Sequence, residues 1–282
     1  MTQASPPISP EDLDGWRAFV GRTETRRQVL DVEAARRFAA AVGADLDVEG
    51  GLPPLAHWAY FLEAVGPAGL GADGHPRRGE GLLPPVRLPR RMFASAAMTF
   101  AEPLILGRDA ELTLTVAKVS HRAGRTGDLV FVDVDRSLVQ DGRVRLTERQ
   151  TIVYRGIGEP TPPVEPSSEA SGDGGAVWTP GPVDLFRFSA VTFNSHRIHY
   201  DLPYATGEEG YPALVVHGPF TAAKLFARAS ATLGGPLTAF SFRAVAPLFA
   251  GQAVRLRAGG ETGAFEAVRC DGAIAMSAQA SA

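Results

Sequence analysis

The chain has 282 residues and contains little cysteine, no excess of basic charge and no long apolar run. Its one cysteine, Cys270, excludes an intrachain disulfide, and no apolar run follows a basic stretch at the start. Both features favour a reduced, cytoplasmic protein. Because no run of about 18 apolar residues escapes interruption by charge, glycine or proline, no segment is expected to span a membrane.

The charge balance excludes a further class of partners. The 28 Lys plus Arg residues are offset by 31 Asp plus Glu, which gives a net charge of −3. Nucleic-acid binding needs a basic excess on one face, so the composition argues against it. The chain also lacks a Walker motif and a G-x-G-x-x-G sequence after a strand, which predicts no nucleotide cofactor.

A segment rich in Pro, Gly, Ser and acidic residues divides the chain. Residues 156–176 read GIGEPTPPVEPSSEASGDGGA and hold almost no large apolar side chains. Such a stretch does not bury enough surface to repay its ordering entropy, so it is interpreted as a flexible linker. The prediction is an N-terminal domain over 1–155 and a C-terminal domain over 177–282.

Hydrophobic periodicity predicts that helices precede strands in both parts. In the first part we expect helices at 10–20, 32–42 and 55–65, then strands at 97–100, 110–120, 129–140 and 144–155, with turns at 124–127 and 141–142. In the second part an irregular or helical entry precedes a helix at 219–233 and strands at 237–246, 252–259, 263–269 and 273–278. This pattern is typical of an α+β fold with antiparallel sheets.

A short sequence echo links the two parts. Residues 103–112 (PLILGRDAEL) and 247–256 (PLFAGQAVRL) share Pro-Leu-x-x-Gly and a later Leu in register. Each copy stands between an apolar helix and a run of strands, which indicates internal repetition. The alternative is that Pro-Leu-x-x-Gly is a common turn at the start of a strand.

The polar residues with chemical potential gather just before the helix at 219–233. His196, His199 and His217 lie in the second part, with Asn194 before them and Gly218 after them. His199 is the best candidate for proton transfer because an imidazole titrates near neutrality. The alternative is a hydrogen-bonded structural histidine. Asn194 orients water or polarises a carbonyl in this interpretation but does not accept a proton.

The sequence His217-Gly218-Pro219 opens that helix. Unpaired N–H groups and the positive end of the helix dipole there stabilise a developing oxyanion, and Gly218 is the expected donor because proline has no N–H. The alternative is an ordinary helix start. The spacing of His196 and His199 suits a metal, but no third ligand follows nearby, so no metal site is predicted.

These residues resemble the MaoC-like dehydratases, in the branch with a degenerate N-terminal hotdog that includes mesaconyl-CoA (3-methylfumaryl-CoA) hydratases and 3-hydroxyacyl-thioester dehydratases. The resemblance is carried by residues 192–201 and 216–219, with further likeness in 52–62, 74–79, 83–86 and 88–92. It implies a double hotdog, with two antiparallel sheets that each wrap a central helix.

The resemblance also implies a reaction and a substrate. It implies reversible hydration of an α,β-unsaturated acyl-CoA, with mesaconyl-CoA or itaconyl-CoA giving citramalyl-CoA. His199 would be the base and the Gly218 N–H would hold the thioester carbonyl. Where the wider family has Asp in Asp-x-Asn-Pro-Leu-His, this chain has Asn194, so a mechanism with two bases is in doubt. The other residues expected to bind substrate are Arg197, His196, His217, Arg90 and Arg91.

Two other functions compete with this hypothesis. One is dehydration of a 3-hydroxyacyl group on acyl carrier protein or CoA, and the other is an acyl-CoA-binding protein without activity. The exposed edge that a hotdog sheet presents favours a homodimer.

Overall fold

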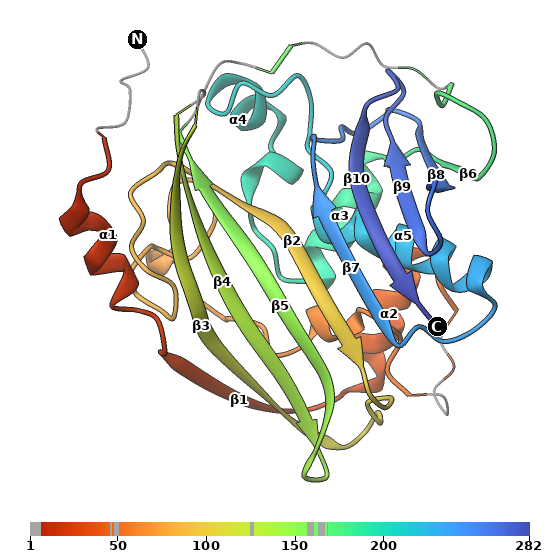
Figure 1. Ribbon diagram of the computed structural model, residues 1–282, viewed down its shortest axis with the longest axis horizontal. Coiled ribbons are helices and arrows are strands. Elements are labelled where there is room, and N and C mark those ends of the chain that lie inside the picture. Colours follow the sequence, from red (N-terminus) through yellow and green to blue (C-terminus); the bar gives the residue numbers. More distant parts are fainter. Residues whose placement is uncertain are drawn as a thin grey trace.

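The computed structural model describes residues 7–45, 47, 51–124, 127–156, 161–162, 167 and 169–282. Its ten strands form a single sheet in which every neighbouring pair is antiparallel, in the order β1-β3-β4-β5-β2-β7-β10-β9-β8-β6 (Figure 1). The first half contributes β1 (Thr23–Val29), β2 (Arg90–Phe100), β3 (Asp109–Gly124), β4 (Gly127–Gln140) and β5 (Arg143–Arg155). The second half contributes β6 (Ala176–Trp178), β7 (Ala239–Ala244), β8 (Val254–Ala258), β9 (Ala264–Val268) and β10 (Ile274–Ser281).

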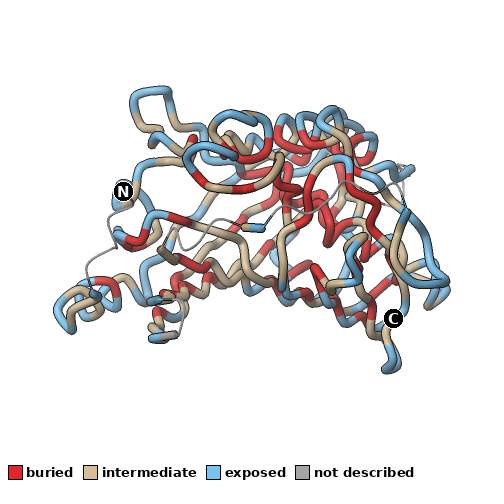
Figure 2. The backbone as a smooth tube through the Cα atoms, turned by 90° about the horizontal axis from the view of Figure 1, so that it is seen from above, coloured by how far each residue is buried: buried red, intermediate tan, exposed pale blue. Residues whose placement is uncertain are grey.

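Capping residues fix the ends of the helices. They are α1 (Pro10–Arg17), α2 (Val32–Val42), α3 (Pro182–Val191), α4 (Leu202–Gly207) and α5 (Gly218–Leu233), with short 3-10 turns η1 (Ala56–Ala59), η2 (Pro67–Gly69) and η3 (Arg197–His199). Asp31 caps α2 through its side chain, and Gly43 ends it at φ 68°. Seen from above, buried residues concentrate between the sheet and the covering helices (Figure 2).

The sheet order repeats from one half to the other. Read outward from the central β2–β7 pair, β5, β4, β3 and β1 on one side match β10, β9, β8 and β6 on the other. The two Pro-Leu-x-x-Gly segments precede the matching strands β3 and β8, and their glycines Gly107 and Gly251 both have positive φ. The internal repetition inferred from the sequence is therefore present in the topology.

Two details of the predicted fold are wrong. The two expected sheets are one, because β2 pairs with β5 on one side and with β7 on the other. The expected helix at 55–65 is only η1, because Leu55 and Phe61 have positive φ and so end the helical geometry on both sides of it. His57 and Trp58 both contact the carboxylate of Glu148.

Other predictions agree with the structure or fall outside it. The helices at 32–42 and 219–233 and the strand pattern after both are confirmed. The turn at 141–142 has positive φ at both residues, as a tight hairpin requires. Strand β1 was not expected, since its sequence TETRRQV is mostly polar. Residues 125–126 of one predicted turn, and 157–160, 163–166 and 168 of the predicted linker, lie outside the described residues. No helix among the described residues has the length and apolarity to cross a bilayer.

Candidate active site

Two adjoining cavities meet at the polar residues that the sequence singled out. A cavity of about 530 Å³ is lined by every predicted site residue except Arg197. A second cavity of about 840 Å³ extends over the first half of the sheet. The residues that line both are Glu63, His75, Pro76, Leu83, Arg91, Phe93, Ile152, Asn194 and Pro219.

The loop after α3 brings Asn194 to the junction of the cavities. Phe193 adopts a φ of 50°, and the Asn194 N–H then donates to the Ser189 carbonyl at 2.9 Å. The side-chain oxygen of Asn194 accepts the His196 N–H at 3.0 Å. This contact uses the amide oxygen within the loop and leaves the amide nitrogen to face a ligand.

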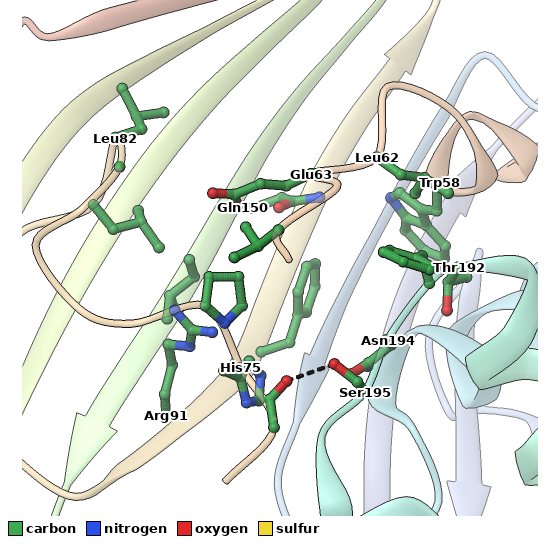
Figure 3. A pocket seen from close by; sticks show the side chains of 18 of the residues that line it. Trp58, Leu62, Glu63, His75, Leu82, Arg91, Gln150, Thr192, Asn194 and Ser195 are labelled. Carbon is green, nitrogen blue, oxygen red and sulfur yellow. Dashed lines mark hydrogen bonds between the residues drawn. The ribbon is translucent and has the colours of Figure 1, made fainter. Parts of the chain in front are cut away.

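A loop of the first half closes against this loop. The Ser195 hydroxyl donates to the Gly74 carbonyl at 2.5 Å, the dashed contact in Figure 3. A Cβ atom on Gly74, whose φ is +87°, would lie 1.9 Å from the Ser195 carbonyl oxygen, so only glycine fits there. The site is therefore built by both halves of the chain.

His199 is buried at the end of η3 with one ring nitrogen engaged. Its Nδ1 lies 2.7 Å from the Val215 carbonyl oxygen. A carbonyl only accepts, so Nδ1 carries the proton and Nε2 keeps a free lone pair. Burial, then the proximity of His217 and His196, lowers the pKa of His199 well below 6.5. The ring is therefore neutral and able to accept a proton at neutral pH.

His217 lies against the ring of His199. The two rings stack with centroids 3.6 Å apart and an interplanar angle of 20°. His217 Nε2 lies 2.8 Å from the Ser189 hydroxyl, and burial lowers the pKa of His217 to about 3. Only 1% of this residue is exposed. The geometry favours a role in positioning His199 over direct contact with a substrate.

His196 faces a second group of polar side chains. Its Nε2 lies 3.7 Å from a carboxylate oxygen of Glu209, and its ring centroid lies 4.2 Å from that of His75. Asp73, His75 and His196 each place one potential ligand atom within 4.8 Å of the others. His199 does not join this group, so the His196-x-x-His199 spacing does not itself form a metal-binding pair. The two residues that join His196 in this group, Asp73 and His75, come from the first half of the chain. They are more than 100 residues from His196, so the sequence did not indicate that they would lie beside it.

The N-terminus of α5 provides a backbone donor beside His199. Gly218 is its first residue, so its N–H has no partner within the helix. In the first half the corresponding residue is Pro54. This correspondence follows from equivalent hydrogen bonds, Leu52 N–H to Leu104 O and Val216 N–H to Leu248 O. Since proline has no N–H, only the second half offers this donor.

The three predicted arginines differ in their partners. Arg90 is buried against Glu209, with Nε 3.2 Å from a carboxylate oxygen and a further contact to the Glu209 carbonyl. Arg197 donates twice to Asp201, at 2.9 and 2.7 Å, and lies outside the smaller cavity. Arg91 points into the junction beside His75 (Figure 3) and forms no ion pair with another described residue. Among the three, Arg91 is the guanidinium open to an anionic ligand.

Several contributing residues were missed by sequence reasoning. The Val215 carbonyl fixes the tautomer of His199, and Ser189 holds His217. A backbone carbonyl carries no residue-specific signal, and a helical serine is common. His75 belongs to the resembling segment 74–79, but its position beside His196 depends on packing between the halves.

Comparisons with known proteins show which proteins this chain is similar to. The family model for hydroxyacyl-thioester dehydratase type 2 matches residues 55–250. The chain is 43% identical over 274 residues to a mesaconyl-C(4)-CoA hydratase of Chloroflexus aurantiacus, covering 93% of this chain and 96% of that protein. It is 26% identical over 234 residues to the mitochondrial hydroxyacyl-thioester dehydratase type 2 of Schizosaccharomyces pombe, covering 73% and 77%.

Solved structures support the fold. HtdX of Mycobacterium tuberculosis superposes with a TM-score of 0.64 at 18% identity, covering 92% of this chain and 99% of that one. Another Mycobacterium tuberculosis protein, described as a double hotdog, gives a TM-score of 0.53 at 14% identity and covers 93% and 95%. These likenesses confirm the double hotdog.

Proposed function

The chain belongs to the hydroxyacyl-thioester dehydratase type 2 family, and from this premise we propose that it hydrates a branched dicarboxylic enoyl-CoA. Family membership makes it a hydro-lyase that acts on thioesters. The proposed substrate is mesaconyl-CoA (3-methylfumaryl-CoA) or itaconyl-CoA, with citramalyl-CoA as product. The single observation that carries the proposal is the buried neutral His199, whose free Nε2 lines the same cavity as the Gly218 N–H.

The reaction follows from these two groups. The thioester carbonyl accepts a hydrogen bond from the Gly218 N–H, which stabilises the enolate-like charge. His199 Nε2 removes a proton from water as the water oxygen bonds to the β-carbon. The resulting imidazolium returns a proton to the α-carbon, so H and OH are added across the double bond. Dehydration is the reverse.

Asn194 and Arg91 complete the proposed site. The amide of Asn194 orients the water or the substrate, since it has no basic lone pair to replace a carboxylate. The guanidinium of Arg91 binds the free carboxylate of the acyl group in fork geometry. Because Arg90 and Arg197 already pair with acidic side chains, they stabilise the walls of the site.

The test is a hydration assay with purified protein. Loss of the enoyl-thioester absorbance of mesaconyl-CoA is expected, with crotonyl-CoA as an uncharged comparison. His199→Ala should lower kcat by about 10²–10⁴-fold. His121→Ala is the matched control, because His121 pairs with Asp128 on β3 and β4 away from both cavities. An undiminished rate in His199→Ala overturns the assignment.

The competing functions give other outcomes. If a 3-hydroxyacyl group on acyl carrier protein outcompetes the CoA thioester, the protein is a dehydratase that acts on carrier-linked substrates. Saturable acyl-CoA binding without turnover would identify a binding protein. The predicted homodimer and cytoplasmic location are retained as part of the proposal. Light scattering of the protein as it leaves a size-exclusion column tests whether it is a dimer.

A further inference from the structure

The larger cavity extends well beyond the catalytic residues. It runs along the first half of the sheet, where η1 stands in place of the long helix that covers the second half. Its far end is lined by Trp58, Leu114, Val134, Arg136 and Gln150. A volume of about 840 Å³ exceeds what a short branched acyl group fills.

A buried arginine at this far end lacks a full set of partners. The Arg136 side chain is 12% exposed, and its Nε has no hydrogen-bond partner among the described residues. Its ion pair is a 3.5 Å approach of Nε to the Glu148 carboxylate. A buried guanidinium with unused donors is costly unless something accepts from it.

Glu148 pairs with Arg136 only through this long approach to Nε, and the Glu148 carboxylate is shared with three other donors. His57 Nε2 lies 3.1 Å from one carboxylate oxygen. Trp58 Nε1 and Gln150 Nε2 donate to the other at 3.0 and 2.9 Å. Although burial raises it, the charges of Arg136 and His57 lower the pKa of Glu148 to about 2, so it stays ionised.

The other charged side chains near Arg136 do not compete with an anionic ligand for its guanidinium. Arg26 is occupied by Glu24 at 2.6 Å and by the Phe61 carbonyl at 2.6 Å. Glu24 and Glu63 are 38% and 49% exposed, so water screens them.

Strand register separates Arg136 from Arg91. Arg91 is opposite Tyr154 on β5, and Arg136 is opposite Glu148 on the same strand. Six residues of β5 span about 20 Å. A short dicarboxylic acyl group at Arg91 therefore does not also reach Arg136.

Resting on the proposed function, we propose that Arg136 binds the terminal carboxylate of a second substrate class, medium-chain enoyl thioesters with a carboxylate at the far end. The chain passes from Gly218 along the apolar wall formed by Phe93, Ile152 and Val134, which line the larger cavity. The carboxylate meets the Arg136 guanidinium in fork geometry, with Gln150 beside it. No residue of the catalytic site changes role.

The experiment compares kcat/KM for medium-chain trans-2-enoyl-CoA substrates of equal length that end in a carboxylate or a methyl group. The wild-type protein should prefer the carboxylate. Arg136→Met should lower the carboxylate-to-methyl ratio by about tenfold to a hundredfold, the value of a charged hydrogen-bonded pair. Arg149→Met is the matched control, because Arg149 lies on the neighbouring strand β5, pairs with Asp135 of β4 and is 59% exposed. It should leave the ratio unchanged.

The carboxylate-to-methyl ratio of kcat/KM separates a loss of carboxylate recognition from a general loss of activity or folding. If Arg136→Met fails to fold, Arg136→Lys keeps a charge beside Glu148 and should lower the ratio by a smaller factor. A ratio that neither variant changes overturns the inference, as does a wild-type protein that hydrates crotonyl-CoA but prefers the methyl-ended chain. A wild-type protein that hydrates no enoyl-CoA overturns the proposed function instead.

Discussion

The Nδ1 atom of His199 lies 2.7 Å from the carbonyl oxygen of Val215, a residue 16 positions further along the chain. This contact fixes the neutral tautomer that leaves Nε2 free. It also holds His199, the proposed base, in the wall of the cavity that Gly218 lines.

The first prediction concerns the pH dependence of hydration. Burial and the two neighbouring histidines lower the pKa of His199 well below 6.5, so the base is neutral above that lowered pKa. We expect kcat/KM to stay flat as the pH falls through 6.5 and to decline only at more acidic values. A profile of kcat/KM for crotonyl-CoA measures this. An acid limb centred at an ordinary histidine pKa would contradict it.

The second prediction isolates the backbone donor of α5. Gly218→Pro removes the N–H at the first residue of α5, a helix position that tolerates proline. We expect kcat to fall by about 10²–10³-fold, as for the loss of an oxyanion donor. The control is the melting temperature, which should change little. Full activity in this variant would exclude the Gly218 N–H from the reaction.

The third prediction separates the two adjacent arginines. Arg91→Met should raise KM for mesaconyl-CoA by about tenfold or more, relative to crotonyl-CoA, because it removes the open guanidinium. Arg90→Met leaves Glu209 buried without its partner and should cost about 3–5 kcal/mol of stability. Steady-state kinetics and urea unfolding distinguish them. A selective rise in KM from Arg90→Met with unchanged stability would reverse the two roles.

The fourth prediction concerns stability in acid. The folded pKa of His217 is lowered from 6.5 to about 3, so between these values the unfolded chain binds more protons. Its contribution is fully present above pH 6.5 and is lost as the pH falls through this window, with a slope approaching about 1.4 kcal/mol per pH unit. In His217→Gln the free energy of unfolding should depend less steeply on pH. Equal slopes in both proteins would show that His217 is not buried in its neutral form.

Sequence patterns were sufficient for the features that depend on near neighbours. The helix that begins at Gly218, the polar loop that ends at His199 and the repeated strand entries at Gly107 and Gly251 all follow from local periodicity and turn chemistry. The Arg197–Asp201 pair was also accessible, because charges four residues apart meet on one turn.

Only tertiary structure decided which groups are free to react. Arg90 is occupied by Glu209, which lies 119 residues further along the chain. The adjacent Arg91 remains open to a ligand. The apolar run at 55–65 has a helical pattern, but the buried carboxylate of Glu148 draws His57 and Trp58 out of that geometry and leaves the larger cavity open. The sequence by itself therefore determined the fold class and the position of His199, the proposed base. Packing between the two halves decided its tautomer, the open arginine and the space for the acyl group, because each depends on partners that are distant in the chain.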